Sequence, residues 1–63
     1  MTKEFTIRRQ ESKDAADTAV RSAVMAYLLS LSNPEWKWLI EPEVLFGNGG
    51  WRGYARIEWE KQK

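Results

Sequence analysis

The side chains best suited to chemistry in this chain are carboxylates that stand two residues apart. Glu41 and Glu43 form one such pair, and Glu58 and Glu60 form a second. A carboxylate acts as a general base when burial or a neighbouring charge raises its pKa. In both pairs the residue between the carboxylates is apolar, which is typical of a strand that turns its charged side chains toward water. We therefore interpret both pairs as a solvated strand surface and expect no enzymatic activity.

Histidine and cysteine are both absent from the 63 residues. Histidine is the commonest general base and metal ligand, and cysteine supplies thiolate ligands, nucleophiles and disulfides. We therefore expect no metal site and no cofactor. The lack of cysteine also fits a reducing compartment.

Arginine and tyrosine alternate at Arg52, Tyr54 and Arg56, a spacing that places all three on one face of a strand. Tyr, Trp and Arg are enriched in the residues that dominate protein–protein binding. Aromatic and basic side chains on a strand also bind single-stranded nucleic acid, for which Arg8 on a neighbouring strand is a fourth candidate. Glutamates expected on the same face repel phosphate, so protein binding is the favoured hypothesis.

Residues 36–59 are expected to form a long β-hairpin that carries these side chains. In the first arm, the even-numbered positions are apolar and most odd-numbered positions are charged. This alternation places one face of the hairpin on a core and the other toward water. The second arm alternates in the same way, with Trp51, Gly53 and Ile57 on the core side.

The sequence Asn48-Gly49 predicts a two-residue type I′ turn, because both central positions of that turn need positive φ. Gly47 and Gly50 then close the turn as a hydrogen-bonded pair. The register that follows pairs Phe46 with Trp51, Val44 with Gly53, Ile40 with Ile57, Trp38 with Trp59, Glu43 with Tyr54, Glu41 with Arg56, and Lys37 with Glu60.

Pro42 indicates which strand lies at the edge of the sheet. In the expected register it faces Ala55 at a site without hydrogen bonds, so its missing N–H costs the hairpin nothing. That missing donor would be needed by a strand on the other side, which makes the first arm an edge. A right-handed crossover makes the first and second strands parallel. The expected sheet order is therefore 2-3-1.

The first half of the chain predicts a strand over 3–9, with Phe5 and Ile7 inward, and a helix over 14–31. Asp14 or Ser12 is expected to cap the helix. Together with strands over 36–46 and 51–60, these elements predict a single α+β domain of β-α-β-β order spanning 1–63, with the helix on one sheet face. The helix stripe expected to face the sheet consists of Ala16, Val20, Ala23, Val24, Tyr27, Leu28 and Leu31.

The first hairpin arm, roughly 36 Å long, exceeds the helix, which is roughly 28 Å long. The tip is therefore expected to overhang the helix and leave Leu45, Phe46, Trp51 and the glycine turn partly bare. Within the covered part, large side chains should meet small ones. We accordingly expect Phe46 and Trp51 near the alanine-rich first half of the helix, and Trp38 and Trp59 under its second half.

The sequence favours a small cytoplasmic protein that acts by binding another protein; by analogy with phage-encoded inhibitors, we expect it to inhibit or modulate a larger protein. The net charge of +1 and the lack of an N-terminal apolar segment argue against membrane association. Alternatives are a homodimer through the edge strand 36–46 and nucleic-acid binding through Arg8, Arg52, Tyr54 and Arg56. The surface expected to contact a protein partner consists of Leu45, Asn48, Trp51, Arg52, Tyr54 and Arg56.

Overall fold

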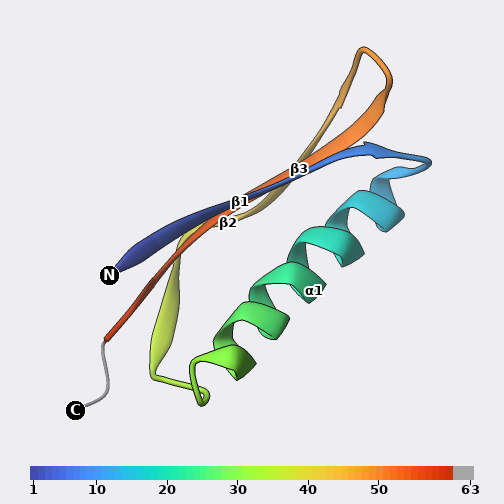
Figure 1. Cartoon of the computed structure of the whole chain (residues 1–63). Coiled ribbons are helices and arrows are strands. Elements are labelled where there is room, and N and C mark those ends of the chain that lie inside the picture. The colour runs from blue at the N-terminus through green and yellow to red at the C-terminus, as the bar shows by residue number, and fades with distance from the viewer. Residues whose placement is uncertain (61–63) are drawn as a thin grey trace.

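The computed structural model, which describes residues 1–60, has one helix packed on one face of a three-stranded sheet (Figure 1). The sheet order is β1-β3-β2, and both neighbouring pairs are antiparallel. The predicted α+β class and strand order are therefore confirmed. Each element begins and ends within one residue of its expected bounds: β1 (Thr2–Gln10), α1 (Lys13–Ser30), β2 (Trp36–Gly47) and β3 (Gly50–Trp59).

The helix begins at a serine cap. Ser12 has extended backbone angles (φ −147°, ψ 167°), and its side chain accepts a hydrogen bond from the Ala15 N–H at 3.1 Å. Of the two expected caps, Ser12 thus holds this position, while Asp14 lies in the first turn near the positive end of the helix dipole. After the helix, positive φ values at Ser32 and Asn33 turn the chain toward β2.

The core lies between the helix and the half of the sheet near both chain ends. The Tyr27 ring packs between Phe5 and Trp59. Its centroid lies 5.7 Å from that of Phe5 and 5.3 Å from that of Trp59, both in edge-to-face geometry. Each fully buried aliphatic side chain in such a core contributes about 1.5–3 kcal/mol. The expected helix stripe is confirmed, since its members are buried or packed against the buried cluster of Phe5, Val20, Val24, Leu28, Ala55, Ile57 and Trp59.

The helix comes close to the sheet at Gly53. A Cβ atom at Gly53 would lie 2.9 Å from the Ala16 carbonyl oxygen and 3.3 Å from the Val20 Cβ. Real Cβ atoms do not come so close to a backbone atom, so only glycine fits at this point of β3. The small residues at the start of the helix therefore meet a glycine, and Phe46 and Trp51 lie farther out along the hairpin than expected.

The hairpin register is as predicted near the turn and shifted near the chain ends. Phe46 pairs with Trp51, Val44 with Gly53, and Glu43 with Tyr54. Beyond these pairs two irregularities in β2 change the alignment, one between Glu43 and Ile40 and one between Ile40 and Trp38. The predicted pairs at the far end are wrong: the observed partners are Ile40 with Arg56, Trp38 with Ile57, Lys37 with Glu58, and Trp36 with Trp59.

Both irregularities are places where β2 holds more residues than β3. From Glu43 to Trp38 the first arm advances five positions, while from Tyr54 to Ile57 the second advances three. Pro42 therefore lies within a bulged segment and not in a regular pair with Ala55. A bulge tolerates proline because it leaves a residue outside the hydrogen-bond ladder. The expectation that β2 forms a sheet edge holds.

The bend at Asn48-Gly49 is closed by Gly47 and Gly50, as predicted, but it is not of type I′. Gly49 has φ 92°, whereas Asn48 is not among the residues with positive φ. A negative φ followed by a positive one matches a type II turn, which needs glycine only at its second central position. The tip extends past the start of the helix, as the element lengths predicted (Figure 1).

Candidate functional site

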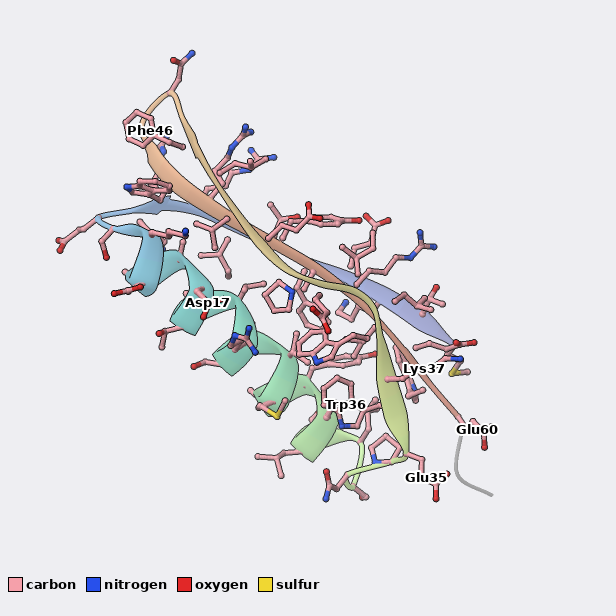
Figure 2. The ribbon with its side chains drawn as sticks, turned by 180° about the vertical axis from the view of Figure 1, so that it is seen from behind. Asp17, Glu35, Trp36, Lys37, Phe46 and Glu60 are labelled. Atoms are coloured by element: carbon pink, nitrogen blue, oxygen red, sulfur yellow. The ribbon has the colours of Figure 1, made fainter. Side chains whose placement is uncertain are left out.

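The part of the hairpin beyond the helix, residues 45–52, is here called the hairpin end. Leu45 and Phe46 are neighbours in β2, so their side chains point to opposite faces, yet 60% and 71% of their surfaces are exposed. Figure 2 shows the Phe46 ring near the tip, beyond the first turn of the helix. Because the helix stops short of this segment, an apolar side chain on either face remains in contact with water.

Trp51 belongs to the hairpin end and not to the main core. Its ring packs edge-to-face against Phe46 with centroids 5.2 Å apart, and its backbone pairs with Phe46 on one side and Gln10 on the other. The indole is half-buried by these neighbours. Trp51 thus packs against the exposed Phe46 ring in an edge-to-face geometry that stabilises aromatic pairs.

Three arginines surround the same end of the sheet. β1 is irregular between Ile7 and Gln10, so Arg8 and Arg9 together face Arg52 of β3. Arg9 adopts φ 59° in this irregularity. None of the three arginines forms an ion pair within residues 1–60. Their positive charge is therefore available beside the apolar side chains of the hairpin end.

Arg52 connects the arginines to the apolar residues. It lies opposite Leu45 in the ladder. Its guanidinium also packs across Gly47, where an added Cβ would lie 3.3 Å from Nε. An arginine held over glycine and beside leucine presents its planar face and its charge at one place, which suits a protein contact.

Farther from the tip, the outer sheet face becomes more balanced in charge. Tyr54 is half-buried between Thr6 of β1 and Glu43 of β2. Arg56 directs Nη1 toward the Glu4 carboxylate at 3.9 Å, and its Nε is buried without a hydrogen-bond partner among the described residues. The expected Glu41–Arg56 pairing across the hairpin is replaced by this contact with β1.

The structure brings together four of the six residues predicted to bind a partner. Leu45, Asn48, Trp51 and Arg52 all belong to the hairpin end, and Tyr54 adjoins them. Arg56 lies apart in a contact with Glu4. The predicted partner-binding residues did not include Phe46, although the sequence already placed it on the part of the hairpin beyond the helix. They did not include Arg9 either, because nothing in the sequence indicated the irregularity in β1.

The residues predicted for nucleic-acid binding are only partly contiguous. Arg8 and Arg52 face each other on the neighbouring strands β1 and β3, and Tyr54 lies two residues farther along β3 on the same face. Arg56 is engaged by Glu4, and Glu43 stands beside Tyr54 on the same face. A single-stranded chain that ran from Arg52 along β3 to Arg56 would meet the carboxylates of Glu43 and Glu4.

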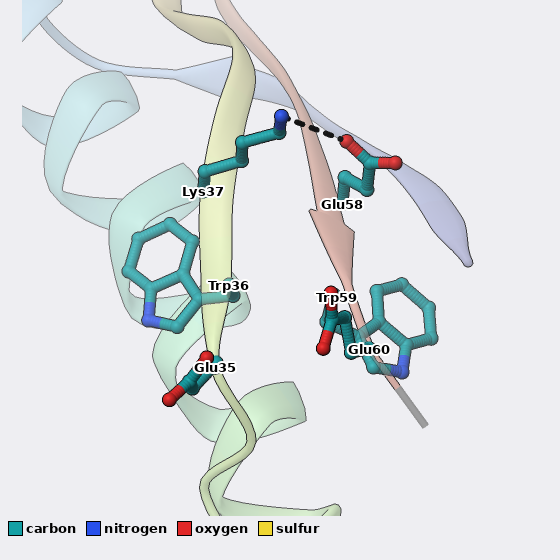
Figure 3. Close-up of a pocket in the computed structure, with 6 residues that line it drawn as sticks. All are labelled: Glu35, Trp36, Lys37, Glu58, Trp59 and Glu60. Carbon is teal, nitrogen blue, oxygen red and sulfur yellow. Dashed lines mark ion pairs between the residues drawn. The ribbon is translucent and has the colours of Figure 1, made fainter. Parts of the chain in front are cut away.

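The opposite end of the molecule carries a shallow depression of about 230 Å³ lined by acidic and aromatic residues (Figure 3). The Lys37 amino group and the Glu58 carboxylate point toward each other across the strands at 3.4 Å, with Glu58 in place of the expected Glu60. Glu35 and Glu60 also line the depression, beside Trp36 and Trp59 (Figure 3). Three carboxylates and one lysine thus line this depression, whereas three arginines surround the other end of the sheet.

Two further properties bear on the kinds of site that the chain holds. No set of three or more Asp or Glu side chains in the part described by the structure is grouped closely enough to hold a metal ion. The helix within residues 1–60 lacks the length and apolar character needed to cross a membrane. Comparison with protein-family models, with curated proteins and with solved structures finds no match for the chain.

Proposed function

We propose that the protein acts by binding another protein through its hairpin end. The observation that carries this proposal is the exposure of Leu45 and Phe46, with Arg52 opposite Leu45. Large apolar side chains next to arginine form the centre of many protein interfaces. Burying both would remove two exposed hydrophobic side chains from water without any change in the fold.

The charges at this end favour one kind of partner surface. Arg8, Arg9 and Arg52 are free of ion pairs within the described chain. A partner that offers an apolar pocket bordered by carboxylates would pair with these arginines while covering Leu45 and Phe46. Inhibition of a larger protein by occupation of such a pocket is the form of activity that we favour.

The test is affinity purification from the native host with two matched variants. Leu45→Ser with Phe46→Ser should keep the fold, since both side chains are exposed, and should lose the bound protein. The control, Met25→Ser with Leu29→Ser, removes exposed apolar side chains from the outer face of the helix and should keep it. A partner retained by the first variant would contradict the proposal.

Nucleic-acid binding is the alternative outcome of the same purification. Nucleic acid retained by the wild-type protein should be released steeply as salt rises, because phosphate contacts displace counterions. It should also be lost from the variant Arg52→Glu with Arg56→Glu. A protein partner anchored by Leu45 and Phe46 should respond to salt far less.

A further inference from the structure

The two edges of the sheet differ in how well they are protected against pairing with another strand. β2 forms one edge, and Pro42 and two bulges interrupt it. Proline and bulges are means by which proteins block such pairing. β1 forms the other edge, and its pairing with β3 is regular from Thr2 to Ile7. β1 is therefore the edge open to a further strand.

The free backbone groups of β1 can be identified from its first pair with β3. Met1 and Trp59 exchange two hydrogen bonds, each of 2.9 Å, from the amino terminus of Met1 and from the Trp59 N–H. Bonded and non-bonded pairs alternate along an antiparallel ladder, so the odd-numbered residues of β1 bond to β3. The outward N–H and C=O groups accordingly belong to Thr2, Glu4, Thr6 and Arg8.

The Arg8 carbonyl shows this outward direction. It accepts a hydrogen bond from Nε2 of the Gln10 side chain at 3.1 Å, and not from a strand. Gln10 Nε2 is exposed in this contact. A backbone N–H from an incoming strand can replace a side-chain donor of this kind at little cost, because the Gln10 amide then returns to water.

We propose that a second copy of this chain pairs with β1, antiparallel and centred on Thr6, to give a continuous six-stranded sheet. With this centre, Glu4 lies opposite Arg8 of the second copy, and Phe5 lies opposite Ile7. Opposite charges then meet on the outer face and apolar side chains meet on the inner face, twice each by symmetry. Lys3 lies opposite Arg9 in this register, but Arg9 (φ 59°) belongs to the irregular part of β1 and not to the regular ladder. From Glu4 to Arg8, β1 is thus complementary to itself.

Neighbouring registers lack this complementarity. A centre at Glu4 sets that carboxylate directly against its own copy, which is unfavourable. A centre at Phe5 sets Lys3 against Ile7 on the inner face and leaves Glu4 without an opposite charge. The charge pattern of β1 therefore favours Thr6 as the centre.

The two helices fit on the same face of the joined sheet. Helix α1 packs on β1 and on β3 to the same extent. In the six-stranded sheet the midlines between β1 and β3 of the two copies are separated by two strand spacings, roughly 10 Å. This separation matches the distance of about 8–10 Å between the axes of packed helices. The two helices therefore fit side by side without collision, and Phe5 and Ile7 from both copies lie beneath them.

This interface shares Arg8 with the proposed binding surface and is otherwise separate from it. Leu45 and Phe46 are on β2, at the far side of the sheet from β1. Pairing through β1 leaves both side chains exposed. The dimer can thus be tested, and can fail, without reference to any other partner.

The first test is the molar mass in solution, measured by light scattering or analytical ultracentrifugation over a concentration series. The wild-type chain of 7.4 kDa should approach twice that mass as concentration rises. Thr6→Pro should remain a monomer, because it removes an outward N–H that β3 does not use. A wild-type chain that stays a monomer at the concentration of an NMR sample, or a dimer that persists in Thr6→Pro, would overturn the proposal.

The second test examines the register by charge reversal. Arg8→Glu should raise the Kd of the dimer by about tenfold, since two attractive pairs become repulsive. Glu4→Arg should act likewise, and the double variant Glu4→Arg with Arg8→Glu should restore the wild-type Kd. Circular dichroism on each variant checks the fold, because Glu4 also contacts Arg56. A double variant as weak as the two single ones would rule out this register.

Discussion

Ser12 and Asp14 illustrate how one side chain is selected for a role that either could fill. Serine and aspartate are both good helix caps, so residue type does not distinguish them. The backbone does, because Ser12 is extended while Asp14 is already within the first helical turn. The cap position is set by the short connection from β1, which ends at Gln10.

Replacement of Ser12 should therefore destabilise the protein more than replacement of Asp14. Ser12→Ala removes the acceptor for the Ala15 N–H and should lower the free energy of unfolding by about 1 kcal/mol. Ser12→Asp should restore most of that loss. Urea denaturation monitored by circular dichroism measures the difference. Equal losses for Ser12→Ala and Asp14→Ala would show that the serine cap has no special role.

Phe46 shows, at the scale of a residue, that periodicity and element lengths lead to different predictions, and its exposure confirms the one from lengths. An apolar residue on the inward-facing side of a strand is normally assigned to the core, and Phe46 has that position in the alternation of β2. Its exposure follows from where the helix begins and not from its own neighbours in sequence. The lengths of helix and strand predicted the overhang, but periodicity alone assigned Phe46 to the buried face.

The hairpin, at the scale of an element, was predictable in its faces and in the position of its turn, but not in the type of turn or in its full register. A slip of one residue reverses which side chains face the core, so the pattern detects it. β2 carries one additional residue on each side of Ile40, so the alignment is shifted by one residue at Ile40 and by two at Trp38. A total shift of two keeps Trp38 and Trp36 on the face that the alternation predicts, so this end of β2 looks the same with or without the bulges.

Gly53 provides the prediction that belongs to this scale. Gly53→Ala should lower the free energy of unfolding by about 1–3 kcal/mol, because the new Cβ would meet the Ala16 carbonyl and force the helix away from β3. Thermal and urea denaturation measure the loss.

Gly47→Ala is the matched control in the same hairpin. Its Cβ would meet only the Arg52 side chain, at 3.3 Å, and a flexible arginine can move. This variant should stay close to wild-type stability. If Gly53→Ala proved as stable as Gly47→Ala, the helix and sheet would have to lie farther apart than described here.

The molecule as a whole is elongated, with extents of 42 × 17 × 13 Å. Its buried cluster lies toward the chain ends, where Val24, Leu28 and Ile57 are fully buried, and the hairpin end contributes no residue to it. Segments with few buried contacts open more often than the segments that form a core. Stability is therefore unevenly distributed along the hairpin.

Native-state hydrogen exchange, followed by NMR, should show this gradient. Backbone amides of Ala55 and Ile57 should exchange last, near the rate set by global unfolding. Amides of the hairpin end that bond across the hairpin, such as those of Leu45 and Arg52, should exchange earlier through local opening. Uniform protection along β3 would contradict a core confined to one end.

The separation between core and overhang also bears on how such a chain can change over generations. Substitutions at Leu45 or Phe46 alter a surface that folding does not depend on, so selection can act on them without a compensating change elsewhere. Val24 or Ile57 has no such freedom. Lineages descended from this chain should accordingly keep the interior and diversify at the tip.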